Sequence, residues 1–526
     1  MKMQFAFLGA LAALSLIAAG CHRTPSAVAT TTAAAPVPYT ITLTPVDTTN
    51  LNLPALQSYC LAEMPQGWLI TGGRINTGLH TFNTSGNNFP PTTEDPDLWW
   101  VDGTTHKAVA ALALSALKPE FADPLMASNQ ECALDAQGNL YVIGGYGMDR
   151  ASGKMTTFDS LIRVPAADIA TIMTSSLTPS QKAAKVGAAM QQAGNIIHNS
   201  QFAVTGGALE QMPSGSYALI FGQNFKGEYN PFEQTAAVYT QQVRAFSVRP
   251  GTTQLLVPPY AVNQPNADFH RRDLNVVPSV NPATGQTRMA ALGGVFQPGI
   301  IGAYDFPAYI SESGGQMTVS ADHGATAHQR FNQYECPVVV VYDPDGKAVY
   351  YTLFGGIGHY YYWQTPQQNA VYKEVTAAGR NDGMPFTEDI TTLLQTANGA
   401  YQEWIAPQPI PGNRLDGASA DFIPELAASQ QYQGNSRILN LQSIAPGASV
   451  PIGYIYGGIE AQYPLPCVPS HGTAGTNHLY QVTITRTPWN GMIPAAQGHE
   501  ATPGPGGPFN HESRTTTSAC TPPVQK

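Results

Sequence analysis

The chain has 526 residues, a formal net charge of −10 and a charged fraction of only 11%. Because the sequence contains no run of lysines and arginines that could follow a phosphate backbone, its composition argues against nucleic acid as a partner. The 50 glycines, 43 prolines and 43% hydrophobic residues predict strands linked by long turns around a large core.

The first 21 residues resemble a bacterial lipoprotein signal peptide. Lys2 precedes an apolar run from Phe5 to Ala19, which is too short to span a membrane comfortably and ends at Gly20-Cys21. Such signals usually carry Leu where this chain has Ala18. An ordinary signal peptide, cut near an Ala-x-Ala site, is therefore the alternative.

The lipoprotein resemblance implies that Cys21 becomes an acylated N-terminus. Residues 22–37 are rich in Thr, Ala and Pro and are expected to form a flexible tether. We expect the protein in the bacterial cell envelope, at the outer membrane, and in contact with the membrane through its lipid anchor only.

Six short apolar runs each end in a glycine pair or, once, in Gly-Gln. They recur at comparable intervals, which indicates an internal repeat. The runs are Trp68–Gly73, Tyr141–Gly145, Ala218–Gln223, Met289–Gly294, Tyr351–Gly356 and Tyr454–Gly458.

A strand-like piece and a turn precede each of these glycine strands. In the fifth copy, Cys336–Tyr342 is followed by the turn Asp343–Gly346, a pattern typical of a β-hairpin. The corresponding pieces of the third, fourth and sixth copies are weaker and lie at 201–204, 273–277 and 421–423. Because a further strand pair follows most of the glycine pairs, the pattern predicts four strands per unit.

These units resemble kelch repeats, in which a glycine pair ends the second strand. The resemblance implies an all-β fold, namely a six-bladed kelch-like β-propeller over residues 38–488 with short helical insertions. Most copies lack the Tyr and Trp that kelch repeats carry after the glycines, and a β-sandwich or several small β-domains is the alternative. Tyr39–Thr44 has no glycine strand of its own, so we expect it to complete the last blade and close the ring.

Two segments interrupt the repeat and are predicted to be helical. Thr178 is an N-cap candidate before a run of helix formers that reaches Ala193. Phe386–Asn398 is expected to form a second short helix. Residues 489–526 show little periodicity and are expected to form an irregular tail that is wrapped or loose.

The cysteines divide into three groups. Cys21 is assigned to the lipid, which leaves five in a compartment that permits disulfides. Cys60, Cys132 and Cys336 occupy inner strands and are interpreted as small packing residues. We expect a disulfide between Cys467 and Cys520 to hold the tail on the last blade.

The polar residues just before the inner strands are candidates for a ligand site. In a propeller these strands line a central channel, and amides, carboxylates and arginines at its mouth suit a hydroxyl-rich or charged ligand. A wet channel mouth on a scaffold protein is the alternative. The candidate ligand-binding residues are Glu131, Asn199, His270, Arg271, Arg272, Asp273 and Glu335.

The sequence favours a monomer that binds a protein or a glycan through these loops. Kelch-type sugar-acid mutarotases or epimerases supply the enzymatic alternative, in which Arg272, Glu131 and Glu335 would act at the mouth. No catalytic residue is assigned, because no Ser-His-Asp order, phosphate loop or paired-cysteine metal site stands out in the sequence.

Metal and cofactor sites are not expected. The spacing of His323, His328 and Arg330 does not match a compact metal motif. Copper radical oxidases also use a kelch-like propeller, but the Tyr-His pair of that family is missing here. The aromatic run that follows His359 is expected to pack against the protein rather than to stack on a sugar.

Overall fold

The computed structural model describes residues 37–75, 89–229, 237–298, 303–323, 329, 331–358, 360–364, 369–373, 384–462, 472–495 and 499–500. The signal-like segment, Cys21 and the tether up to residue 36 lie outside these residues. So do Cys467, Cys520, His328, Arg330 and His359.

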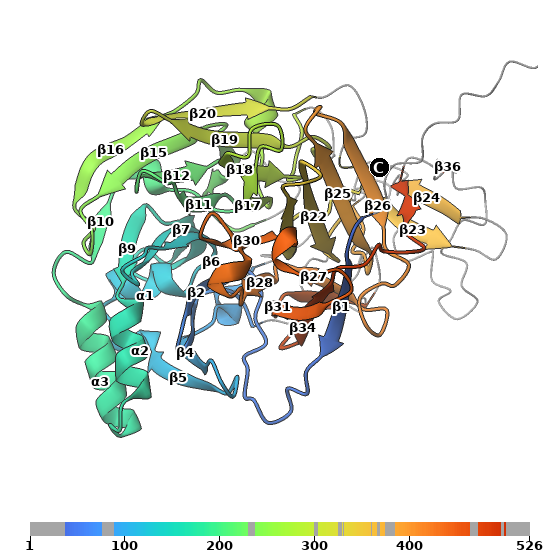
Figure 1. Ribbon diagram of the computed structural model, residues 1–526. Coiled ribbons are helices and arrows are strands. Elements are labelled where there is room, and N and C mark those ends of the chain that lie inside the picture. The colour runs from blue at the N-terminus through green and yellow to red at the C-terminus, as the bar shows by residue number, and fades with distance from the viewer. Residues whose placement is uncertain are drawn as a thin grey trace, which may run out of the picture. The chain divides into compact units, whose positions relative to one another are not determined.

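The chain forms antiparallel sheets whose first strands lie towards a common centre, the arrangement of a β-propeller (Figure 1). Three of the sheets come from the first half of the chain. Their strands are β2 (Cys60–Met64), β3 (Gly67–Thr71), β4 (Asp97–Asp102) and β5 (Ala108–Ala113); β6 (Ser128–Leu134), β7 (Leu140–Asp149), β9 (Ser160–Val164) and β10 (Ile196–His198), with β8 (Lys154–Thr157) beside β7; and β11 (Ala208–Gln211), β12 (Tyr217–Ile220), β15 (Val243–Val248) and β16 (Leu255–Ala261).

Three more such sheets come from the second half. Their strands are β17 (Asn275–Val280), β18 (Thr287–Leu292), β19 (Ala308–Ser313) and β20 (Gln316–Ala321); β21 (Val338–Asp343), β22 (Ala348–Phe354), β25 (Ile390–Thr396) and β26 (Tyr401–Ile405); and β28 (Asp421–Pro424), β31 (Ser449–Tyr456), β34 (Leu479–Thr485) and β1 (Thr40–Pro45).

The glycine positions lie inside β7 in the second sheet. In the other five sheets they follow the second strand directly or after one residue, as the repeat predicts. The glycines have a physical reason to be there. Gly144 has a φ of +63°, and a Cβ at this position would lie 1.9 Å from the carbonyl oxygen of Val204, which precedes the inner strand of the next sheet. The glycine signal therefore marks points where neighbouring sheets approach too closely for a side chain.

The N-terminal strand completes the last of these sheets. β1 pairs antiparallel with β34, with Thr40 opposite Thr485 and Pro45 opposite Tyr480. The prediction that Tyr39–Thr44 pairs into the sheet that holds Tyr454 is confirmed. The two ends of the repeat are therefore held together by a backbone ladder.

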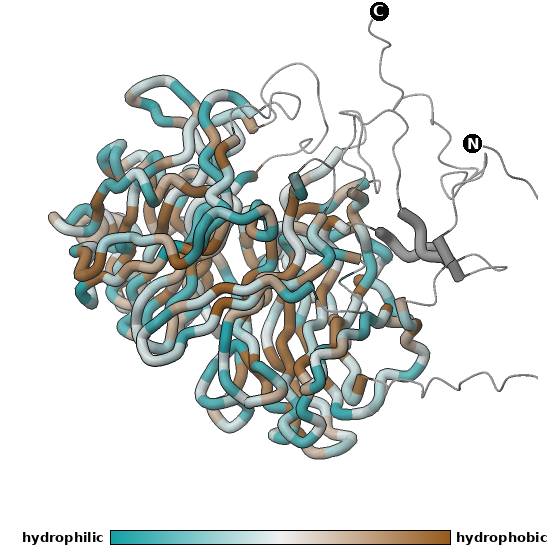
Figure 2. Tube along the Cα trace, turned by 90° about the horizontal axis from the view of Figure 1, so that it is seen from above, coloured by the Kyte–Doolittle hydropathy of each residue, from teal (hydrophilic) through white to brown (hydrophobic). Residues whose placement is uncertain are grey.

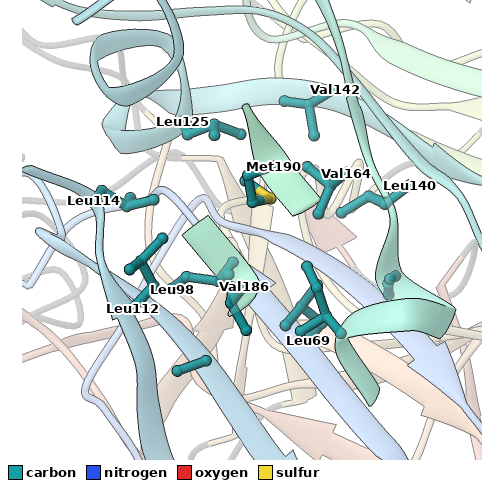
Figure 3. Packing of buried hydrophobic residues seen from close by; sticks show 14 of the residues in the cluster. Leu69, Leu98, Leu112, Leu114, Leu125, Leu140, Val142, Val164, Val186 and Met190 are labelled. Atoms are coloured by element: carbon teal, nitrogen blue, oxygen red, sulfur yellow. The ribbon is translucent and has the colours of Figure 1, made fainter. Parts of the chain in front are cut away.

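The core lies between the sheets. Around the first two sheets, leucines from β3, β4, β5 and β7 pack with Val142 and Val164 and with the helix α1 (Pro119–Met126) (Figure 3). Val186 and Met190, one turn apart on α3 (Pro179–Met190), are both fully buried in this cluster. The tube in Figure 2 shows the hydrophobic positions mainly along the strands, with hydrophilic residues prominent in the loops.

The first predicted helix is confirmed, and its start has the expected cap. Thr178 accepts the backbone N–H of Gln181, whose side chain returns a bond to the N–H of Thr178. A second helix, α2 (Ala166–Thr174), precedes it. Among the described residues, no helix is long and apolar enough to cross a membrane.

Two secondary-structure predictions are wrong. Residues 390–396 form strand β25 rather than a helix, because their β-branched Ile390, Thr391 and Thr392 fit a ladder between β22 and β26. Residues 201–204 are not an inner strand; Phe202 and Val204 are fully buried in the core, and the inner strand of that sheet is β11.

Cys60 and Cys132 form a disulfide, with their Cα atoms 6.0 Å apart. The interpretation of these two residues as unpaired packing residues is therefore wrong. They face each other because β2 and β6 are neighbouring inner strands of consecutive sheets. Cys336 is free and buried, as predicted.

Further short sheets decorate the ends of the long ones. They comprise β13 (Gln223–Phe225) with β14 (Ala237–Tyr239); β27 (Leu415–Ala418), β32 (Ile459–Ala461) and β33 (Thr473–Gly475); and β23 (Tyr360–Gln364), β24 (Asn369–Lys373) and β36 (His499–Glu500). The described start of the predicted tail is not loose, because Trp489 is buried and β35 (Ile493–Pro494) pairs with β26.

A hairpin from the last repeat lies along an inner strand of another sheet. Its strands are β29 (Gln431–Tyr432) and β30 (Asn435–Asn440), and β30 pairs in parallel with β21. From β30, Arg437 reaches Glu210 on β11, with Nη1 3.1 Å from Oε1. The hairpin therefore spans from the inner edge of one sheet to that of another.

Candidate functional site

The turns that precede the inner strands lie side by side, and backbone hydrogen bonds join five of the neighbouring pairs. In each turn one residue has a left-handed conformation, which is uncommon outside glycine. Asn129 donates its N–H to the carbonyl of Ser58 at 3.1 Å, and Asp273 donates to Gly206 at 2.7 Å. We call these residues the axial ring; they are Ser58, Asn129, Gly206, Asp273, Glu335 and Ser419.

The residue that follows each glycine position forms a β-bridge with the residue that directly precedes an axial-ring residue in the sequence. These bridged pairs form the wall of a cavity of about 120 Å³, which we call the mouth cavity. The five pairs that line it are Gln57 with Arg74, Ser128 with Tyr146, Thr205 with Gln223, Arg272 with Val295, and Tyr334 with Ile357. One repeated position of the sequence thus supplies a side chain from each of five sheets to the same cavity.

The wall of the mouth cavity carries both polar and apolar side chains. The residues that follow the first three glycine positions are Arg74, Tyr146 and Gln223. Those that follow the next two are Val295 and Ile357, and these belong to a buried apolar cluster. The cavity therefore offers hydrogen-bonding groups and an apolar surface to the same ligand.

Arg272 is the predicted ligand-binding residue with the clearest place in this cavity. Its Nε lies 3.1 Å from Oδ2 of Asp273, and its Nη2 donates to the hydroxyl of Tyr229 at 2.9 Å. The guanidinium also lies over the ring of Phe296, 5.2 Å from its centroid. The charge of Arg272 is therefore compensated by its own neighbour in the chain.

Arg271 is placed differently and holds its loop. It is fully buried and donates from Nη1 to the carbonyls of Gly293 at 3.0 Å and Phe306 at 2.9 Å. Its guanidinium carbon lies 4.2 Å from the centroid of the Tyr304 ring, and burial lowers its pKa to about 9. Arg271 is not among the described residues that line the mouth cavity.

Two other candidates also lie away from the described lining. His270 stacks on Tyr239 with ring centroids 3.6 Å apart, and its Nδ1 lies 2.8 Å from the carbonyl oxygen of Phe296. Asn199 caps a short 3₁₀ helix by accepting the N–H of Gln201. Asn199 was a candidate only because residues 201–204, which follow it, were predicted to be an inner strand, and that prediction is wrong.

The structure brings the candidates Glu131, Asp273 and Glu335 together at the axial ring. The amide Nδ2 of Asn129 donates to Oε1 of Glu335 at 2.9 Å and to Oδ1 of Asp273 at 3.4 Å. Glu131 accepts the N–H of Gly207 at 2.9 Å. Three carboxyl groups from neighbouring turns therefore share one small region.

Burial makes these carboxyl groups weak acids. It raises the pKa of Glu131 to about 8 and raises the pKa of Asp273 despite the nearby Arg272. For Glu335, burial and then the proximity of Asp273 raise the pKa. The cluster can therefore hold protons at neutral pH, which suits a group that donates a hydrogen bond or a proton.

The free energy of unfolding is expected to fall as the pH rises from about 4.5 to about 8, the range between the ordinary and folded pKa of Glu131. Each unit by which folding raises the pKa of a buried acid lowers the stability of the folded state by about 1.4 kcal/mol once the acid is deprotonated. Glu131→Gln should flatten this slope, as measured by urea unfolding from pH 5 to 9. Exposed Glu120→Gln is the control, and equal slopes in both variants would contradict the prediction.

A second cavity of about 180 Å³, the far cavity, lies against the same axial ring. It is lined by Glu131, Asp273, Glu335 and Asp421 and by Arg437 of the hairpin. Among the described residues, no group of three or more His, Cys, Asp or Glu is arranged to hold a metal ion.

No family model matches this chain, and no curated protein matches it. Solved structures do. YjhT is 12% identical with a TM-score of 0.42, over 83% of this chain and 99% of the other. A glycoside hydrolase family 43 arabinoxylan arabinofuranohydrolase from Bacillus subtilis is 12% identical with a TM-score of 0.34, over 84% and 93%. The Dos1 propeller is 10% identical with a TM-score of 0.29, over 81% and 92%.

Proposed function

We propose that this chain is an envelope-anchored lipoprotein whose six-bladed, kelch-like propeller binds a hydroxyl-rich ligand, a glycan or a small sugar, in the mouth cavity. The observation that carries the proposal is the composition of the cavity wall. Hydroxyl and amide groups of Ser128, Thr205 and Gln223 line the same cavity as aromatic rings such as Phe296. Sugars present hydroxyl groups at their edges and apolar C–H faces, and this wall offers partners for both.

The cysteine chemistry supports the export part of the proposal. A disulfide persists in oxidising compartments such as the bacterial periplasm and is rare in the cytosol. The disulfide between Cys60 and Cys132 thus agrees with a signal that ends at Cys21. Mass spectrometry of the mature N-terminus tests the anchor, which requires an acylated Cys21.

A second candidate function is acid–base chemistry on a sugar acid, of the mutarotase or epimerase type. The observation that favours it is the pair Asp273 and Glu335, which share the amide of Asn129 and line the mouth cavity. A protonated and an ionised carboxyl side by side can donate and accept a proton in turn. This candidate requires turnover in addition to binding.

Calorimetric titration of the purified protein with a panel of neutral sugars, oligosaccharides and sugar acids tests the binding function. We expect at least one ligand to bind, and Phe296→Ala to weaken it about 10-fold because a stacking surface is lost. Tyr260→Ala is the control, since Tyr260 is 48% exposed on the outermost strand β16. Binding that is unchanged by Phe296→Ala would move the ligand away from the mouth cavity, and a panel without any ligand would contradict the function.

A further inference from the structure

Arg74 is a buried cation for which the described part of the chain supplies no counter-ion. It follows the first glycine pair, is 1% exposed and lines the mouth cavity. Its hydrogen bonds go to neutral acceptors: Nε donates to Ser128 Oγ at 3.1 Å, and Nη1 donates to Thr93 Oγ1 at 2.9 Å and to the Pro90 carbonyl at 3.3 Å. Among the described residues, no carboxylate lies within ion-pair distance of Arg74.

Glu94 is the carboxylate whose charge acts on Arg74, but it is bound to other groups. Its Oε2 lies 3.0 Å from Nη2 of Arg150, and its Oε1 accepts the N–H of Met148 at 2.7 Å. Burial lowers the pKa of Arg74 to about 10, so the guanidinium is still charged at neutral pH. A charge held out of water without an ion pair is costly to the folded state.

The other two arginines near the mouth show why Arg74 is distinct. Arg272 lines the same cavity but is paired with Asp273. Arg271 lacks an ion pair but is surrounded by carbonyl oxygens and aromatic rings away from the cavity. Arg74 alone of the three lines the cavity and has no carboxylate within ion-pair distance among the described residues, where its Nη2 also lacks a hydrogen-bond partner.

A second unsatisfied polar atom lines the same wall. Among the described residues the side-chain oxygen Oε1 of Gln223 has no hydrogen-bond partner, and Gln223 is 4% exposed. Buried acceptors of this kind are nearly always satisfied in folded proteins. A ligand hydroxyl or N–H would supply the missing donor.

We propose that Arg74 is the anion-recognition residue of the mouth cavity, and that the ligand carries a carboxylate for Arg74 Nη2 together with a hydroxyl or N–H for Gln223 Oε1. The inference rests on the proposed function only in taking the mouth cavity as the ligand site. Arg74 offers a single positive charge and one N–H donor group, Nη2, without a partner among the described residues, and a carboxylate matches it with a single negative charge. The ligand class is therefore a hydroxycarboxylic acid, with sugar acids as its carbohydrate members.

The test compares matched ligands on matched variants by calorimetric titration. D-glucuronate and D-glucose differ at one carboxylate, and mandelate is a hydroxycarboxylic acid that is not a sugar. The wild-type protein should bind an acid, and Arg74→Met should weaken that binding about 10- to 100-fold because a charge-assisted hydrogen bond is lost. Arg74→Lys should retain part of the affinity, and Arg249→Gln, which removes an exposed charge, should retain all of it.

The melting temperature of the ligand-free protein separates this role from a structural one. Arg74→Met should melt at or above the wild-type temperature, because an uncompensated buried charge is removed. If Arg74→Met does not fold, Gln223→Leu gives the second reading, with an expected loss of about 10-fold in affinity for the acid.

The outcomes distinguish the two proposals. Equal binding of D-glucose and D-glucuronate, unchanged by Arg74→Met, would overturn the role of Arg74 and leave the sugar-binding function standing. Arg74-dependent binding of mandelate, with no sugar or sugar acid bound, would support the role of Arg74 and overturn the carbohydrate function. Acids that bind independently of Arg74 and Gln223 would overturn the inference.

Discussion

Deletion of residues 38–47 should abolish cooperative folding. The segment contains β1, whose backbone pairs with β34 along its whole length, and its side chains Tyr39, Ile41 and Leu43 are at most 8% exposed. Each fully buried side chain of this kind contributes about 1.5–3 kcal/mol, so the three together contribute roughly 5–9 kcal/mol. This is comparable to the entire stability of a typical domain.

Circular dichroism during urea titration is the measurement, with loss of the sigmoidal transition as the expected result. Two point variants provide a milder, matched pair. Leu43→Asp places a charge in the core and should destabilise strongly, whereas Thr42→Asp on the exposed face of the same strand should have little effect. A deletion variant that unfolds cooperatively at the wild-type midpoint would show that the chain does not need this closure.

The sheet order was predictable because the glycine pairs have a steric cause. Gly144 and Gly355 have φ of about +60°, and a neighbouring backbone carbonyl leaves no room for a Cβ atom at either position. Side chains are therefore excluded there, and the exclusion is visible in the sequence as a recurring glycine. The orphan strand at Tyr39–Thr44 was also predictable, since a ring with one unpaired edge has one obvious place for a spare strand.

Other parts of the fold depend on partners that are remote in the sequence. Ile390–Thr396 has helix-compatible residues, but β22 and β26 cover both of its edges, and this tertiary context decides in favour of a strand. Phe202 and Val204 alternate like a strand, yet they fill the core beside Gly144. The local sequence pattern cannot distinguish two alternating apolar residues in a β-strand from two that are buried in the core outside any strand.

About half of the candidate site could be predicted from the sequence. Glu131, Arg272, Asp273 and Glu335 all meet at the axial ring, because residues just before inner strands converge on the axis. Arg74 was missed, although a signal exists: it is the residue immediately after a glycine pair. The wall is built from that position, which becomes evident only once the sheets are arranged around a centre.

Removal of the disulfide between Cys60 and Cys132 should lower the free energy of unfolding by roughly 4 kcal/mol, the value expected from the entropy of a closed loop of this length. The two cysteines are 72 residues apart and join neighbouring inner strands, so the bond ties the first two sheets together. The variant Cys60→Ala/Cys132→Ala should show the loss in urea unfolding, and dithiothreitol should bring the wild-type protein to the same midpoint.

Cys336→Ala is the matched control, because Cys336 is buried in an inner-strand region but makes no disulfide. It should lose only the contacts of one sulfur atom, including a weak hydrogen bond from Asn275 at 3.6 Å, and dithiothreitol should still destabilise it by the full amount. The double variant, in contrast, should be insensitive to the reductant. A double variant that loses stability in dithiothreitol as much as the wild type does would assign the effect to other cysteines. Peptide mapping that finds Cys60 and Cys132 unlinked in the purified protein would contradict the disulfide itself.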